Sequence, residues 1–250
     1  MALEIGYVEA IFRYPVKSMR GEALNAATLG WHGFEGDRRL ALRRLNDRGG
    51  FPWLNASRFP GLLLYAPCRH GLGSDGDLPT HILTPDRDEL PVFSEELVSE
   101  VERRSGARVE MMHLKDGIFD DANVSVISSE TVREIGRLAG FSLDARRFRP
   151  NIVVRPLRSE PFQESEWLGG ILSFGDASGA TAISVTINDV RCSTVNFDPD
   201  SAKSAPEVLK AIVRVNQNNA GIYGAVVRTG RVTIGQRVIF DGIRGEVSPA

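Results

Sequence analysis

The sequence predicts a mainly β protein with a few helices, and it favours a β-barrel architecture over a doubly wound α/β fold. Most short apolar runs have strand character, and many are bounded by Gly, Pro, Asn or Asp, where strands usually end. Only three segments repeat apolar residues at helical spacing. The 25 glycines and 13 prolines are scattered, so no low-complexity linker is visible.

The predicted strands follow one another along both halves of the chain. They cover residues 3–12, 38–42, 62–66, 81–83, 109–112, 124–127, 152–154, 171–174, 182–187, 222–227 and 231–239. Thr229-Gly230 separates two apolar runs, and such a pair is typical of a tight hairpin turn. We therefore expect residues 225–228 and 231–234 to pair with each other.

Three helices interrupt the strands. Ser94 is placed to cap a helix that runs to Gly106, with acidic residues in its first turn, where they favour the helix dipole. A second helix is predicted from about residue 128 to Gly140, and a third begins at Pro206, a typical first-turn proline. The third helix is expected to bury Val208, Leu209, Ile212 and Val213.

Bulk composition narrows the class of protein. The 250 residues are 42% apolar and 25% charged, as in a soluble globular protein. With 30 basic and 32 acidic residues, the net charge is −2, so we expect no nucleic-acid or membrane partner. No apolar run approaches the ~20 residues that cross a bilayer, and the amino terminus lacks the basic residues of a signal peptide. Two cysteines do not build a disulfide framework, and we expect a cytoplasmic protein.

The strand pattern is interrupted between residues 114 and 122, where a domain boundary is plausible. We predict an amino-terminal β-barrel-like domain over residues 1–114 and a second domain over residues 115–250. No internal repeat of fixed period is visible in either part.

Two motifs near the amino terminus carry chemistry that suits an anion. In Tyr14-Pro-Val-Lys-Ser18, a lysine and a hydroxyl follow a strand, although a solvated turn is the alternative. In residues 33–39, Asp37 can orient Arg38, and an arginine held in this way is a good bidentate partner for phosphate. The alternative for this pair is an ordinary ion pair on a surface loop.

Two later motifs could face the same ligand. Pro150 forces Arg149 toward an extended conformation before a strand, so that Arg149 and Asn151 project from a rigid element. Cys192 ends a strand-like run, and its thiolate would be a soft ligand for a metal or a carrier of persulfide. The alternative, a small buried core residue, is the interpretation that we apply to Cys68. There is no GxGxxG, Walker A or GxSxG motif, and the four histidines lack zinc-site spacing.

In this order, the motifs resemble the MOSC family over nearly the whole chain. Tyr14–Ser18 and Gly36-Asp-Arg38 resemble the MOSC N-terminal β-barrel domain. The MOSC domain proper is resembled by residues 148–154, 161–167, Arg191-Cys192 with Asp198-Pro199, and 230–235. The layout is similar to that of the mitochondrial amidoxime-reducing component and its bacterial counterparts. The resemblance implies a MOSC-type β-barrel with an N-terminal β-barrel-like subdomain.

The resemblance also implies a site for a molybdenum–pterin cofactor. Cys192 would ligate the molybdenum, and Asp198 could help to supply protons, although a turn is the alternative role for Asp198. The residues that would bind the cofactor are Lys17, Ser18, Arg38, Ser128, Thr131, Arg149 and Asn151.

The family function implies a molybdenum-dependent oxidoreductase that reduces small N-hydroxylated or other N–O compounds. The cofactor would carry the redox chemistry, and a separate ferredoxin-, flavin- or cytochrome-type protein would donate the electrons. The alternative is a sulfur-carrier or cofactor-handling domain that works with a pyridoxal-phosphate-dependent sulfurase. A third possibility is a binding protein without catalysis, which the departures from the family pattern at residues 193–197 suggest.

Overall fold

The computed structural model describes residues 2–70, 78–176 and 178–242. The strands are β1 (Ala2–Arg13), β2 (Glu22–Leu24), β3 (Ala26–Gly30), β4 (Gly33–Phe34), β5 (Leu40–Arg44), β6 (Ala66–Cys68), β7 (His81–Leu83), β8 (Glu89–Pro91), β9 (Val109–His113), β10 (Val124–Ser128), β11 (Ile152–Pro156), β12 (Ile171–Phe174), β13 (Thr181–Val190), β14 (Asn219–Arg228), β15 (Gly230–Thr233) and β16 (Arg237–Asp241). The helices are α1 (Glu95–Ser105), α2 (Ser129–Ala139) and α3 (Glu207–Asn216), with short 3₁₀ helices η1 (Pro60–Leu64), η2 (Ala145–Phe148), η3 (Gln163–Trp167) and η4 (Ser193–Asn196).

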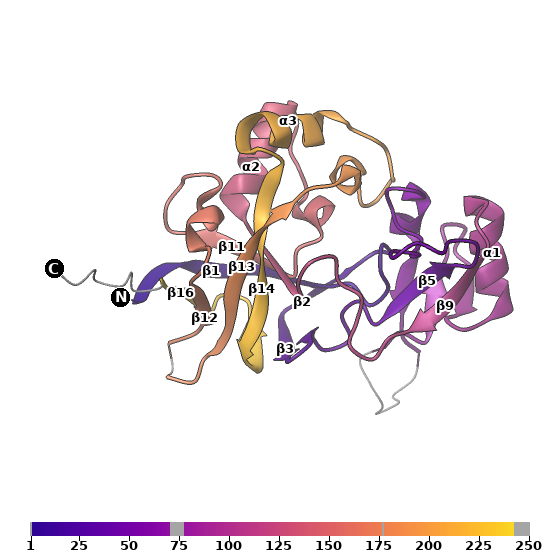
Figure 1. Ribbon diagram of the computed structural model, residues 1–250, viewed down its shortest axis with the longest axis horizontal. Coiled ribbons are helices and arrows are strands. Elements are labelled where there is room, and N and C mark those ends of the chain that lie inside the picture. The colour runs from indigo at the N-terminus through magenta and orange to yellow at the C-terminus, as the bar shows by residue number, and fades with distance from the viewer. Residues whose placement is uncertain (1, 71–77, 177, 243–250) are drawn as a thin grey trace.

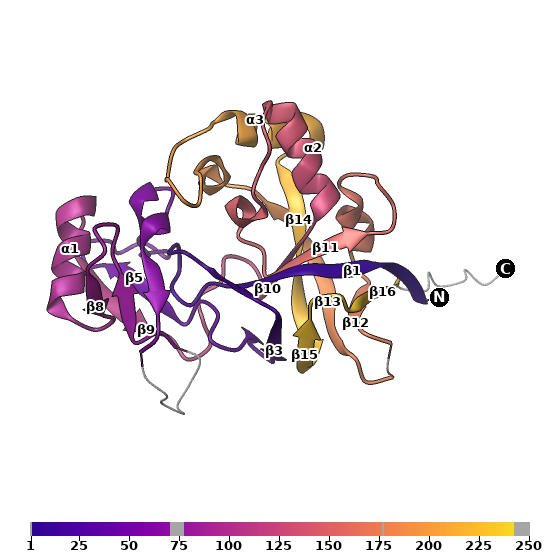
Figure 2. The ribbon, with the colours of Figure 1, turned by 180° about the vertical axis from the view of Figure 1, so that it is seen from behind.

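The largest sheet closes into a barrel. Its strand order is β11-β10-β14-β13-β12-β16-β1-β2, and β11 also pairs with β1, so that seven strands form a closed ring (Figures 1 and 2). The pairing of β10 with β11 is parallel, and the other pairings in this sheet are antiparallel. Alternate residues of the strands, such as Val8, Val126 and Ile183, are buried in the barrel interior. The predicted mainly β fold with a barrel is therefore confirmed.

A second, smaller unit lies beside the barrel (Figure 1). It contains the β5–β9 pair, the β6-β7-β8 sheet and helix α1, around a core that includes Leu40, Leu62, Ile82 and Val101. The first strands of the chain pack with the barrel instead, because β1 pairs with β11 and β16, and Ala27 and Leu29 of β3 lie in the barrel core. The predicted division at residues 114 and 115 stays a prediction.

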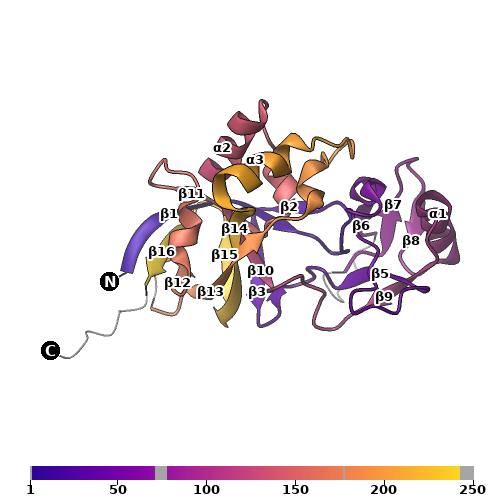
Figure 3. The ribbon, with the colours of Figure 1, turned by 45° about the horizontal axis from the view of Figure 1, so that its top comes forward.

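Helices α2 and α3 pack on the outside of the barrel, where they lie at the top of Figures 1 and 3. The predicted Ser94 cap and the predicted ends of both α1 and α2 at a glycine are confirmed. The Ser94 and Ser128 side chains accept backbone N–H groups at the starts of α1 and α2, and Gly106 and Gly140 end these helices at positive φ.

In α3, the buried residues are Val208, Ala211 and Ile212, at the spacing of one helix face. The prediction that Val213 is buried was wrong, because Val213 lies one step beyond this face and is 52% exposed. No helix among the described residues is long and apolar enough to cross a membrane.

Three strand predictions were wrong. The predicted 225–228/231–234 hairpin does not form, because β14 pairs with β13 as far as Arg228, and β15 pairs with β3. Gly230 (φ 151°) redirects the chain at this point, and a Cβ on it would lie 2.3 Å from Thr181 Oγ1. The run 231–239 is split by a turn at Gly235 (φ 83°). Residues 62–66 were predicted as a strand, but η1 begins at Pro60, whose fixed φ and missing N–H suit a first turn.

Candidate functional site

A cavity of about 290 Å³ lies where the barrel meets the smaller unit. The smaller unit and its connections supply the lining residues Lys17, Ser18, Arg38, Phe51, Asn55 and Ser57. The barrel side supplies Arg147, Phe148, Arg149, Asp189, Val190, Arg191, Cys192, Thr194, Val195 and Tyr223, and the connection between the units supplies Asp120 and Asp121. Five of the residues predicted from the sequence are thus brought together: Lys17, Ser18, Arg38, Arg149 and Cys192.

Three of these residues have an unusual backbone. Ser18, Arg38 and Arg149 adopt φ angles of 65°, 51° and 49°, in the left-handed region that non-glycine residues rarely occupy. Strain of this kind persists where the surrounding structure holds it, and it is concentrated at functional sites. The extended conformation expected for Arg149 was therefore wrong: Arg149 ends η2 in the left-handed conformation despite the following proline.

A buried carboxylate holds the two arginines in place. Asp37 is fully buried and accepts hydrogen bonds from Tyr14 N (2.6 Å) and Asn151 Nδ2 (3.1 Å), and it forms an ion pair with Arg38 Nη1. Arg38 Nη2 in turn donates to the backbone oxygen of Arg149 (3.0 Å). The predicted orientation of Arg38 by Asp37 matches this geometry, whereas Asn151 lies behind the cavity wall as a second partner of Asp37.

The ring of Tyr14 contacts both guanidinium groups. The Cζ atoms of Arg149 and Arg38 lie 4.3 Å and 5.0 Å from the ring centre. Tyr14 itself is buried, so these cation–π contacts are shielded from water and each contributes about 2 kcal/mol. The ring therefore stabilises the two cations that lie close together over it.

Lys17, Arg38 and Arg149 form one wall of the cavity, the cation wall, and this wall is short of negative charge. Burial lowers the pKa of Arg149 to about 10, and repulsion by Arg38 adds to this effect. Burial also lowers the pKa of Lys17, although Lys17 Nζ is 2.8 Å from Asp120 Oδ1. Burial alone would lower the pKa of Arg38 too, but the Asp37 carboxylate reverses that shift. A bound anion would therefore be stabilised at this wall.

One donor on this wall lacks a partner. Arg149 Nη1 donates to the Met19 carbonyl (2.7 Å), but Arg149 Nη2 is buried without a hydrogen-bond partner among the described residues. A buried unsatisfied donor costs about 1–3 kcal/mol, more when it is charged. An anionic ligand in the cavity would supply the missing acceptor, so the residues present fit a phosphate-bearing group.

Cys192 also lines the cavity, two residues after β13 ends. Exposure alternates here: Val190 and Cys192 are exposed, and Arg191 between them is buried. Arg191 donates to the carbonyls of Ala220 (2.6 Å) and Phe148 (2.8 Å), which anchors this segment to the barrel. The Cys192 thiol is therefore presented to the cavity by a rigid backbone.

Two hydroxyl groups surround the thiol. Cys192 Sγ lies 3.3 Å from Thr194 Oγ1 and 3.8 Å from Ser57 Oγ, and the two hydroxyl oxygens are 2.8 Å apart. Ser57 comes from the smaller unit, so the surroundings of the thiol are completed by a segment remote in sequence. Among the described residues, no group of three His, Cys, Asp or Glu side chains is arranged to hold a metal.

Two predicted cofactor-binding residues do not line the cavity. Ser128 caps α2 by accepting from Thr131 N (3.1 Å). Thr131 Oγ1 donates to the buried Glu164 Oε2 (2.8 Å) and accepts from Phe162 N (2.7 Å). Both hydroxyl groups are thus engaged in holding α2 against the barrel.

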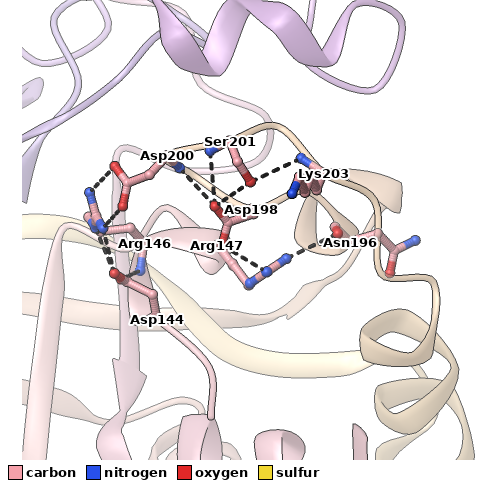
Figure 4. Close-up of polar contacts among 8 residues, drawn as sticks. All are labelled: Asp144, Arg146, Arg147, Asn196, Asp198, Asp200, Ser201 and Lys203. Carbon is pink, nitrogen blue, oxygen red and sulfur yellow. Dashed lines mark hydrogen bonds and ion pairs between the residues drawn. The ribbon is translucent and has the colours of Figure 1, made fainter. Parts of the chain in front are cut away.

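Asp198 also lies outside the cavity lining, in the turn shown in Figure 4. Its Oδ1 accepts from Ser201 Oγ (2.9 Å) and Ser201 N (3.0 Å), and its Oδ2 accepts from Arg147 Nη2 (3.0 Å). Burial acts to raise the pKa of Asp198, but these hydrogen bonds and Arg147 lower it overall. The carboxylate therefore orders the turn and holds Arg147 against the cavity.

Sequence reasoning missed several lining residues. Ser57, Asp120, Asp189 and Tyr223 lie in no recognisable motif, and folding places them in the lining of the same cavity as Cys192. The one local signal concerns Thr194, which stands two residues from Cys192 in a polar stretch. For the others, the contact depends on how the two units meet.

Comparison with known proteins agrees with this architecture. The sequence matches the family model of the MOSC N-terminal beta barrel domain over residues 5–124 and that of the MOSC domain over residues 87–239. No curated protein matches the sequence significantly.

One solved structure shows the same overall fold. The YUAD protein from Bacillus subtilis is 15% identical, with a TM-score of 0.53 over 98% of this chain and 99% of that one. YiiM from Geobacillus stearothermophilus is 20% identical, with a TM-score of 0.38 over 51% of this chain and 58% of that one. The two domain matches together span nearly the whole barrel and the smaller unit, and the chain therefore belongs to the MOSC family.

Proposed function

We propose that this protein is a molybdenum-cofactor-binding oxidoreductase that reduces N-hydroxylated or other N–O compounds with electrons from a separate donor protein. MOSC domains are in general associated with binding of the molybdenum cofactor. The observation that carries the proposal is a single cavity that contains both the Cys192 thiol and a buried cation wall with an unpartnered guanidinium nitrogen.

The two sides of the cavity suit the two ends of such a cofactor. Lys17, Ser18, Arg38 and Arg149 would bind its phosphate, because Lys, Arg and hydroxyl donors form strong charge-assisted hydrogen bonds. Cys192 would be the metal ligand, since thiolate is a soft donor. The described residues form no group of three metal-binding side chains, so the pterin would supply the other ligands.

When bound, the molybdenum–pterin group supplies two-electron redox chemistry. The protein residues position it. Asp37, held by Tyr14 N and Asn151, fixes the direction of Arg38, and the Met19 carbonyl fixes Arg149. Cys192 is exposed, so a small substrate can reach the cavity from solvent.

The proposal is tested by metal and pterin analysis of protein that is co-expressed with an intact cofactor pathway. The wild type should contain molybdenum and pterin near one per chain. Cys192→Ser should lose molybdenum because the soft ligand is gone. Arg149→Gln should weaken binding of the whole cofactor by ~1.5–3 kcal/mol, the scale of a charged hydrogen bond.

Cys68→Ser is the matched control. Cys68 is the other free cysteine, half-buried in β6, and it does not line the cavity. This variant should retain wild-type metal content. Full metal content in Cys192→Ser, or a folded wild type without metal and pterin, would contradict the proposal.

The alternative is a sulfur carrier that works with a pyridoxal-phosphate-dependent sulfurase. The exposure of Cys192 favours it, because a partner has to reach the sulfur to transfer a persulfide. Intact-mass analysis after incubation with a cysteine desulfurase and cysteine decides the matter. A persulfide on Cys192 in protein that takes up no molybdenum would support the sulfur-carrier function instead.

A further inference from the structure

A second buried acid lies in the cavity wall and has no part in the cofactor site described above. Asp189, near the end of β13, lines the cavity, and its side chain is only 4% exposed. Its Oδ2 accepts from Ser125 Oγ (3.1 Å) and lies 2.8 Å from Arg191 Nη2. Its Oδ1 has no hydrogen bond to a described residue, so this oxygen is available to a molecule in the cavity.

The surroundings of Asp189 come from several elements. Arg191 follows it on the same segment, Tyr223 lies on β14, and Arg38 and Asp120 lie on connections that meet at the cavity. Arg191 Nη2 faces Asp189, and the other guanidinium nitrogens donate to the carbonyls of Ala220 and Phe148. Burial raises the pKa of Asp189 to about 6, and Arg191 and Ser125 oppose the shift only partly.

Two further carboxylates near the cavity behave differently. Asp120 is 61% exposed and is paired with Lys17, and the attraction of Lys17 outweighs burial and lowers its pKa. Asp198 is engaged by Ser201 and Arg147 and is not among the residues that line the cavity. Of Asp120, Asp189 and Asp198, Asp189 is therefore the acid that combines burial, a raised pKa and a place in the cavity lining.

We propose that Asp189 is the acid that delivers a proton to the substrate in this cavity. The inference rests on the proposed function, the reduction of an N–O bond. In that reaction the N–O bond breaks and two electrons come from the donor protein. One proton from Asp189 forms an O–H bond, so that oxygen leaves as water, and a second proton from solvent forms the N–H bond. Solvent then returns a proton to Asp189.

The test is the pH dependence of turnover in the cofactor-loaded protein, with an aryl amidoxime as substrate and reduced methyl viologen as electron source. Because the protonated acid is needed, the wild-type rate should fall as pH rises above about 6. Asp189→Asn should lower kcat by ~10²-fold or more with little change in KM, and its profile should lose this fall. Asp189→Glu should restore part of kcat and part of the fall in rate above about pH 6.

Asp176→Asn provides the matched control, because Asp176 is exposed and pairs with Arg237 away from the cavity. Its rate and pH profile should equal those of the wild type. If Asp189→Asn keeps the wild-type kcat and profile, the proposal is overturned. It is overturned equally if Asp198→Asn, rather than Asp189→Asn, loses the fall in rate.

A second readout does not depend on turnover. In the same preparations, infrared difference spectra should show a protonated carboxyl band that disappears as pH rises through about 6 and is missing in Asp189→Asn. If the band is present but the loaded wild type reduces no N–O compound, the proposed function fails and this role of Asp189 fails with it. If the enzyme turns over but the band is absent from the wild type, only the role of Asp189 fails.

Discussion

Replacement of Asp37 by asparagine removes the charge at the centre of the network behind the cation wall. Asp37 is fully buried and accepts from Tyr14 N and Asn151 Nδ2, and it pairs with Arg38. An asparagine of the same shape has one acceptor oxygen and an NH₂ group, so one of the two N–H donors would face another donor. Arg38 would also keep its charge without a counter-ion.

The expected loss follows from these contacts. Breaking a buried ion pair by removing one partner costs about 3–5 kcal/mol. A native domain has about 5–15 kcal/mol of unfolding free energy in total, so Asp37→Asn should lose a large part of the stability. Urea denaturation, followed by fluorescence, measures the change as a shift of the midpoint at constant slope.

Glu110→Gln is the control for the loss of a carboxylate as such. Glu110 pairs with Arg43 (3.0 Å) across β5 and β9, but both side chains are more than 40% exposed. A pair of this kind contributes about 1 kcal/mol or less. If Asp37→Asn loses no more unfolding free energy than Glu110→Gln, the network does not hold the cation wall, and the reasoning is refuted.

Two further stability predictions follow from buried groups. Ser128→Ala removes the cap of α2 and leaves Thr131 N without its acceptor, which should cost about 1–2 kcal/mol of unfolding free energy in urea denaturation; a cost near zero would mean that water replaces the cap. The pKa of Asp189 rises on folding from 3.8 to about 6, so its stabilising contribution is complete below about pH 4 and is lost as pH rises through about 6. A pKa difference of one unit corresponds to about 1.36 kcal/mol, so the wild type should lose about 3 kcal/mol of unfolding free energy relative to Asp189→Asn between about pH 4 and pH 6. If the unfolding free energies of the two proteins change in parallel with pH, Asp189 is not the titrating group.

Local chemistry explains which predictions from the sequence were confirmed. The ends of α1 and α2 depend on Ser94, Ser128 and the following glycines, whose hydrogen bonds reach only a few residues along the chain. Strands of the barrel were recognised from their apolar runs, because each run is long enough to form one strand of the barrel. The hairpin at Thr229-Gly230 failed because strand partners are chosen by the whole sheet: β15 pairs with β3, about 200 residues earlier.

In the candidate site too, the local sequence determined some features and the tertiary structure decided the others. The sequence by itself determined that Lys17, Ser18, Arg38, Arg149 and Cys192 are present, each in a short motif whose residue types suit an anion or a soft metal. Only the tertiary structure decided that they share one cavity, that Asn151 stands behind its wall, and that Asp189 and Ser57 join it. The physical reason is burial. The charge and hydrogen bonding of a side chain depend on which distant segments exclude water from it, and that is set by the closure of the barrel and the docking of the smaller unit.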